Sequence, residues 1–306
     1  MAIQSSGPIS LSDIATEQGI STTNMSLRSM SNTAGFAAPD AITEFYGYSN
    51  LLSEYYIDFT RGNAIKKQTV VPQLLLGATQ DLTVSMWVRQ DATAAAQQNQ
   101  ILFDMSANDT TTTDRYFLQY DKNGNRFVVR MRTNSSNFTQ NYEIETNNAS
   151  MGLGTSASNL WSSTNRGNTN AAGWTLLTIV YDASQSTPAN AFKFYWNDTL
   201  VSNASGAAAG SRTQRNVNYL TLGNNNHNST TTAGGYVGGM DEVKIYTSAL
   251  TAAQVSTIYN NGVIAPAADT LSSFLFTEYD FETNNSSDSA NHFNIVKVNS
   301  ATRTSH

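Results

Sequence analysis

The acidic and histidine side chains are the residues of this sequence that could carry acid–base chemistry. Hydrolysis of a glycosidic bond needs two carboxyl groups that flank it, and alternate positions of one strand can supply such a pair. Glu143 and Glu145 have this spacing but lack a third acid, whereas the adjacent Asp241 and Glu242 are predicted to face opposite sides of a strand. The three histidines are scattered among polar residues without a partner: His227, His292 and His306. We therefore expect no catalytic residues and a protein that is not an enzyme.

Oxygen-rich loops are the candidates for a metal site, because calcium binds to carboxylate and carbonyl oxygens. Four such residues lie in one polar segment: Asp104, Asn108, Asp109 and Asp114. The segment Asp121–Asn125 is superficially similar to a calcium loop. However, Asn123-Gly124 is a strong signal for a type I′ turn between strands at 116–120 and 126–132. We predict a hairpin there, a solvated loop at 104–114, and no metal or cofactor, with calcium kept as an alternative.

An aromatic side chain beside amides is the pattern expected of a sugar-binding site. Trp87 shares its strand face with Ser85 and Arg89, opposite the apolar Val84 and Met86, so we predict that it lies on an outer face. Two long polar loops, 147–173 and 223–235, add further candidates. These ligand-binding candidates are Trp87, Trp161, Asn224, Asn225, Asn226 and His227. The alternatives are that Trp87 packs beneath a loop and that the asparagine-rich loop forms a subunit contact.

The composition restricts the classes of partner. Of the 306 residues 40% are hydrophobic and only 13% are charged, and the net charge of −6 comes without any basic run. This balance argues against nucleic-acid binding. There is no cysteine, so neither a disulfide framework nor a thiolate metal site can form. We also expect no membrane insertion and no export by a signal peptide, because no segment has the necessary apolar length.

The segment 236–262 combines a strand with a short capped helix. Val243 and Ile245 point to one side of the predicted strand, whereas Lys244 and Tyr246 point to the other. Thr251 is predicted to be a helix N-cap with Gln254 completing a capping box, and Leu250 precedes the cap as one half of a hydrophobic staple. The pattern predicts a scaffold element rather than a catalytic one.

The same segment resembles the closing signature of the LamG-like, concanavalin A-like jelly-roll superfamily. Three upstream segments resemble the other expected strands in order: Leu82–Arg89, Gly173–Asp182 and Phe192–Val201. In the last of these, Asn197-Asp198 replaces the usual Asn-Gly turn, which both residue types tolerate. The resemblance covers about residues 52–264 and implies an all-β jelly-roll sandwich with a short helical N-terminal extension.

The first 50 residues contain signals for short helices. Ser10 is predicted to cap a helix with Asp13 three residues on, and the pattern recurs at Met25–Met30, with a third helix over Ala41–Tyr46. Helices this short are marginal alone, so we expect a partner surface to complete them. The predicted anchor residues are Ile9, Leu11, Ile14, Leu27, Met30, Phe45 and Tyr46.

A second resemblance covers about residues 1–48. The opening Met1–Gly19, MAIQSSGPISLSDIATEQG, followed by Ile42–Gly47, is similar to the N-terminal segment of many structural proteins of tailed bacteriophages. The resemblance implies an anchor that attaches the protein to the virion. The alternative is a plain helical cap on the sandwich.

The last 42 residues contain two apolar runs, Phe274–Phe281 and Phe293–Val298, that read as strands. Two strands without a sheet are not stable. We therefore expect them to pair with the edge of this domain, or alternatively with a neighbouring subunit.

Together these patterns predict three segments: a helical virion anchor at 1–50, a LamG-like jelly roll at 51–264 and a C-terminal strand extension at 265–306. The expected function is that of a non-enzymatic structural protein of the virion, as a decoration or as a tail or fibre component. It would be made in the bacterial cytoplasm and exposed on the particle in several copies, with other virion proteins and a host-surface glycan as partners. The alternative is a carbohydrate-binding adhesin with optional calcium at its rim loops.

Overall fold

The computed structural model describes part of the chain. The described residues are 9–17, 23, 26–33, 41–42, 55–59, 64–68, 74–90, 99–107, 114–121, 126–133, 142–146, 174–201, 203–205, 212–224, 235–261, 271, 275–279, 296–298 and 302–305.

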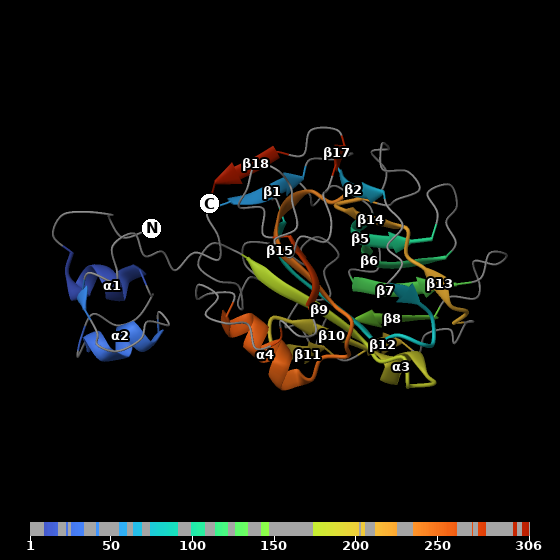
Figure 1. Cartoon of the computed structure of the whole chain (residues 1–306), viewed down its shortest axis with the longest axis horizontal. Helices are drawn as coiled ribbons and strands as arrows, with labels where there is room; N and C mark the ends of the chain where they lie inside the picture. Colours follow the sequence, from blue (N-terminus) through green and yellow to red (C-terminus); the bar gives the residue numbers. More distant parts are fainter. Residues whose placement is uncertain are drawn as a thin grey trace.

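Two large antiparallel sheets form a sandwich (Figure 1). In spatial order, the first sheet contains β11 (Thr199–Val201), β10 (Phe192–Trp196), β9 (Thr175–Tyr181), β4 (Leu82–Gln90), β15 (Gly238–Tyr246), β1 (Tyr55–Phe59) and β18 (Thr302–Ser305), with β16 (Leu275–Tyr279) also paired to β15. The second contains β12 (Asn203–Ser205), β8 (Tyr142–Thr146), β7 (Arg126–Arg132), β6 (Arg115–Asp121), β5 (Gln100–Ser106), β14 (Tyr219–Leu222), β2 (Ala64–Gln68) and β17 (Val296–Val298). A small pair joins β3 (Leu75–Leu76) to β13 (Arg215–Asn216). The predicted all-β jelly-roll sandwich is therefore confirmed.

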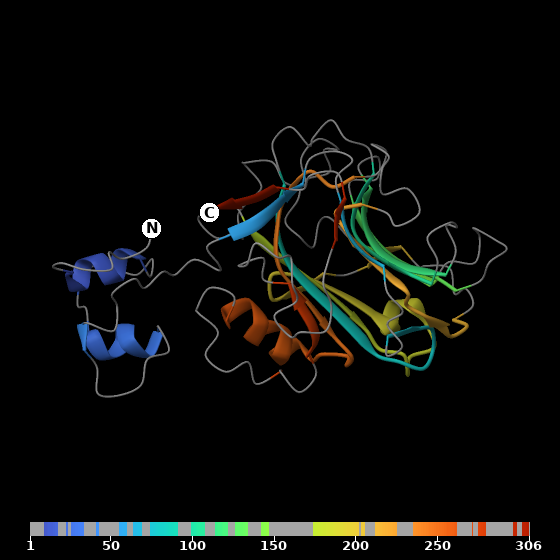
Figure 2. The same cartoon turned by 45° about the horizontal axis from the view of Figure 1, so that its top comes forward.

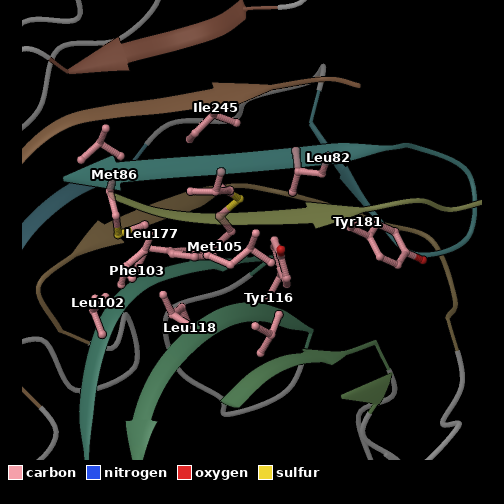
Figure 3. Close-up of a cluster of buried hydrophobic side chains, with 14 of the residues drawn as sticks. Leu82, Met86, Leu102, Phe103, Met105, Tyr116, Leu118, Leu177, Tyr181 and Ile245 are labelled. Carbon is pink, nitrogen blue, oxygen red and sulfur yellow. The ribbon is translucent and has the colours of Figure 1, made fainter. Parts of the chain in front are cut away.

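The core lies between the two sheets and follows the alternation of each strand. In β4, Val84 and Met86 are fully buried and face the second sheet, and Leu118 of β6 is buried opposite them. Figure 3 shows Met86 and Leu118 between the strands of the two sheets, together with Met105 and Tyr116. The predicted hairpin is also present, since β6 and β7 pair in register from one end to the other.

Helix α4 (Ala252–Asn261) covers the outer face of the first sheet. The predicted capping box is present: the Thr251 backbone N–H donates to Gln254 Oε1 (2.8 Å), and the Gln254 N–H donates to Thr251 Oγ1 (3.3 Å). Leu250 and Val255 are both buried, as the hydrophobic staple requires. The helix thus has a fixed start and an apolar stripe that packs on the sheet.

A β-bulge in β15 corrects one sequence prediction. Asp241 lies opposite Trp87 and Lys244 lies opposite Ser85, so β15 has one extra residue between these two pairs. Glu242 takes a φ of 47° and its carboxylate pairs with Lys244 at 3.0 Å. Asp241 and Glu242 therefore do not face strictly opposite sides, because the bulge breaks the two-residue period on which that prediction rested.

Two short helices precede the sandwich, α1 (Leu11–Glu17) and α2 (Leu27–Thr33). Ser10 caps α1 as predicted, because its Oγ accepts from the Asp13 N–H (3.2 Å). The Ser10 hydroxyl (2.8 Å) and N–H (2.7 Å) both donate to Asp13 Oδ2, and these two hydrogen bonds lower the pKa of Asp13. A short helix, α3 (Pro188–Ala191), joins β9 to β10. None of the described helices is long and apolar enough to cross a membrane.

The predicted anchor residues pack on one another. Ile14 and Met30 are completely buried together with Ala15 in a small cluster. Three others are partly buried against it: Ile9, Leu11 and Leu27. Ile14 and Met30 consequently cannot offer their side chains to a partner, which corrects that part of the anchor prediction. Phe45 and Tyr46, with most of the third predicted helix, lie outside the described residues.

The C-terminal segment supplies strands to both sheets of its own chain. β16 pairs with β15, β17 pairs with β2, and β18 pairs with β1. The first two fall within the predicted runs, whereas β18 was not predicted. β1 and β16 pair with the same edge of β15, β1 along residues 238–240 and β16 along residues 243–246. An early strand and a late strand of the chain therefore lie next to each other on β15.

Removal of residues 265–306 deletes β16, β17 and β18 and leaves the edges of β15, β2 and β1 open. We expect the Tm to fall by about 5–10 °C and the shortened chain to self-associate, because open edges pair with other chains. Thermal unfolding and sedimentation velocity measure the two effects. A chain shortened by residues 1–50 serves as the control. A C-terminally shortened chain with an unchanged Tm would contradict this role.

Candidate functional site

The predicted sugar-binding residues do not form a surface site among the described residues. Trp87 does lie on the outer face of its sheet, but it is only 1% exposed and stacks on Tyr259 of α4, with ring centroids 5.7 Å apart. Asn224 is fully buried. Trp161, Asn225, Asn226 and His227 lie outside the described residues. Trp87 is therefore a core residue beneath a helix, and its assignment as a sugar platform was wrong.

The segment 104–114, predicted as a solvated loop with calcium binding as the alternative, is also organised differently. Asp104 is part of β5 and pairs with Arg115, and the Asp114 carboxylate accepts from Arg215 Nε at 2.8 Å. Asn108 and Asp109 lie outside the described residues. Within the described part of the chain, no group of three or more histidine, cysteine or acidic side chains is arranged to hold a metal ion.

The outer face of the second sheet carries a dense set of charged side chains. Strand register places Asp104, Phe117, Arg130 and Glu143 in one row across β5, β6, β7 and β8, and Arg115 opposite Arg132 in the next row. In Figure 2 the green strands curve with their hollow side turned away from the first sheet. We name this surface the arginine face, defined by Asp104, Arg115, Phe117, Asp121, Arg126, Arg130, Arg132, Glu143 and Glu145.

The Arg115–Asp104 pair is the most deeply buried part of the arginine face. Arg115 Nε donates to Asp104 Oδ1 (3.0 Å) and Arg115 Nη2 to Asp104 Oδ2 (2.5 Å), so the contact is bidentate. The side chains are 5% and 0% exposed. A bidentate contact fixes the orientation of both side chains. Removal of either partner would leave the other charge buried and uncompensated.

The ring of Phe117 packs against three of the arginine side chains. It is 2% exposed, and the guanidinium carbons of Arg115, Arg130 and Arg132 lie 4.5, 5.8 and 5.6 Å from its ring centroid. Planar guanidinium groups pack favourably on an aromatic face. Burial, followed by the charges of Arg130 and Arg115, lowers the pKa of Arg132 to about 10, so it stays protonated at neutral pH.

The remaining carboxylates of the face are each held by an arginine. Arg130 Nε donates to Glu143, Arg126 Nη1 donates to Glu145 Oε2 (2.6 Å), and Arg126 Nη2 lies 3.3 Å from Asp121 Oδ2. Glu143 and Glu145 share a face, as predicted, but each is neutralised by its own partner.

The charges of the arginine face balance. Its described side chains comprise four arginines (115, 126, 130 and 132) and four carboxylates (104, 121, 143 and 145). The surface therefore presents many hydrogen-bond donors and acceptors without a large net charge. The sequence shows these residues at alternate positions of β7 and β8, but the pairing that joins them depends on a register that local patterns do not contain.

A comparison with known families agrees with the sandwich fold. A family model described as the concanavalin A-like lectin/glucanases superfamily matches residues 62–256, more than half of the chain. The chain belongs to this superfamily. No match was found among curated proteins.

Several solved structures share the fold. A candidate carbohydrate-binding protein from Bacteroides ovatus is 14% identical with a TM-score of 0.50, over 83% of this chain and 60% of that one. A heptameric SAP-like pentraxin from Limulus polyphemus is 12% identical (TM-score 0.45; 83% and 95%). The CBM40 of a Ruminococcus gnavus sialidase, bound to sialyllactose, is 11% identical (TM-score 0.43; 67% and 96%). At these identities the likeness concerns the fold alone.

Replacement of Trp87 tests its assignment to the core. We expect Trp87→Ala to lower the free energy of unfolding by about 3–5 kcal/mol, because it opens a cavity between β4 and α4. Urea unfolding followed by circular dichroism gives the value, with Trp87→Phe as a milder control. A change below about 0.5 kcal/mol, typical of surface sites, would instead indicate an exposed side chain.

Proposed function

We propose that this protein binds carbohydrate without chemically altering it, and that the arginine face is its glycan-binding surface. The observation that carries the proposal is the charge-balanced array of ion-paired side chains on rigid strands. Several of these groups are reachable: the side chains of Arg126, Arg130 and Glu145 are 35%, 19% and 14% exposed.

The chemistry of the array suits a neutral sugar chain. Sugar hydroxyls both donate and accept hydrogen bonds, and the face offers guanidinium donors next to carboxylate acceptors. The ion pairs and Phe117 hold these groups in place before a ligand arrives, which reduces the entropy lost on binding. A net charge near zero gives no advantage to a polyanion such as nucleic acid.

The same geometry argues against glycoside hydrolysis on this face. Both mechanisms need one protonated and one ionised carboxyl group beside the bond. Here Glu143, Glu145 and Asp104 are each paired with an arginine rather than with another carboxyl group. The proposal also includes no cofactor, so glycan binding is expected to be unchanged by EDTA.

Arg126→Ala tests the arginine face. We first select a glycan on a glycan array with the full-length protein, and then measure its Kd by calorimetry. Loss of a charged hydrogen-bond donor removes about 1.5–3 kcal/mol, so we expect binding to weaken by roughly 10- to 100-fold. Arg28→Ala, an exposed arginine of α2, is the matched control. An unchanged Kd for Arg126→Ala, or no array binding at all, would overturn the proposal.

A second candidate function, attachment to a phage particle, is favoured by the α1–α2 pair. Its apolar side chains form a cluster of their own, composed of N-terminal residues alone, and its exposed side chains include Asp13, Arg28 and Ser29. We propose that these exposed faces, rather than the buried Ile14 and Met30, contact other virion proteins. The jelly roll would then be displayed on the particle surface in several copies, where weak glycan contacts add up.

Co-sedimentation with purified particles tests this attachment. We compare the full-length protein with a chain that starts at Leu51, and we expect only the full-length protein to sediment with the particles. The folded state of the shorter chain is checked by its Tm. Equal sedimentation of both chains, or of neither, would rule out the N-terminal anchor and leave a free glycan-binding protein.

A further inference from the structure

A pocket of about 490 Å³ lies at the edge of the first sheet. Its walls come from the turn after β9, from α3, from β10 and from the edge strand β11. This volume is within the range of pockets that hold small organic ligands. We name it the edge pocket, and the residues that carry its chemistry are Asp182, Gln185, Ala189, Asn190, Lys193 and Leu200.

The turn after β9 fixes the polar wall. Asp182 Oδ1 accepts from the Ser184 N–H (3.0 Å) and hydroxyl (2.6 Å), and Asp182 Oδ2 accepts from Gln185 Nε2 (3.1 Å). The Ser184 hydroxyl contributes most to lowering the pKa of Asp182, so the carboxylate is ionised at neutral pH. Because its amide nitrogen is held in this way, Gln185 presents its Oε1 as an acceptor.

Two further polar groups of the pocket face solvent. The Asn190 amide is on α3 and the Lys193 ammonium is on β10, and both side chains are exposed. The backbone below them is rigid, since the Asp182 N–H donates to the Ala191 carbonyl at 2.8 Å. The charges of Lys193 and Asp182 offset each other, so the pocket favours a neutral ligand.

The apolar wall contains an unusual side chain. Leu200 of β11 is 53% exposed, and among the described residues it is the one large hydrophobic side chain with such exposure. Ala189 of α3 adds a second methyl group to the pocket lining. The position of β11 is set by the two-residue turn Asn197-Asp198, in which Asn197 has a φ of 57°.

We propose that the edge pocket binds an N-acetylated amino sugar. An acetamido group combines one methyl group, one N–H donor and one carbonyl acceptor on a neutral unit. Leu200 and Ala189 match the methyl group, Gln185 Oε1 matches the N–H, and the Asn190 amide or the Lys193 ammonium matches the carbonyl. A plain hexose has no methyl group for the exposed leucine. This second site does not depend on glycan binding by the arginine face.

Saturation-transfer NMR on the full-length protein tests the edge pocket, with N-acetylglucosamine as the probe and glucose as the comparison sugar. We expect the strongest signal at the acetyl methyl protons and at least a fivefold weaker signal for glucose. Leu200→Ser and Asn190→Ala should each reduce the acetyl signal at least fivefold. Asn216→Ala, an exposed asparagine of β13 outside the pocket, is the matched control. All three sites are exposed, so near-UV circular dichroism should be unchanged.

Two results would overturn the proposal. One is an acetyl signal that is absent or equal to that of glucose. The other is a signal that persists in Leu200→Ser and Asn190→Ala but is lost in Arg126→Ala, which would place the sugar on the arginine face instead. Because the readout uses one monosaccharide and pocket variants, it is separate from the array measurement on the larger glycan.

Discussion

Every strand of this sandwich must bury one face in the core, and that constraint decides what each outer face can be. Side chains alternate along a pleated strand, so a fixed inner set such as Val84 and Met86 fixes the outer set as well. The outer faces of the two sheets differ in their side chains and in what covers them. The first covers an apolar outer face with α4, and the second carries charged side chains that pair with one another.

Charges on a strand surface that is largely removed from water must be paired, because an unpaired buried charge costs several kcal/mol. The bidentate Arg115–Asp104 contact satisfies this requirement at the centre of the arginine face. Such pairs add little net stability, since desolvation offsets much of their attraction. What they contribute is a fixed arrangement of donors and acceptors. That rigidity links the packing of the second sheet to the proposed recognition of sugars.

The two proposed binding surfaces differ because their positions in the fold differ. The arginine face lies on the middle strands of a sheet, where register can hold many polar side chains in rows. The edge pocket lies where the sheet ends, so a turn, a short helix and an edge strand can enclose a small volume. The proposed attachment through α1 and α2, which have a core of their own, would display both surfaces on a particle.

Local patterns in the sequence predicted the capping box at Thr251, the Ser10 cap and the outward direction of Trp87, because each depends on residues a few positions apart. The jelly-roll class was implied by the family resemblance of several motifs in order along the chain. The local patterns did not predict that α4 covers Trp87, that a bulge redirects Glu242, or that β18 closes against β1. The pairing of Arg115 with Asp104 was missed for the same reason. Cross-strand register and the cover over an outer face are set by contacts between distant segments, and only the tertiary structure contains them.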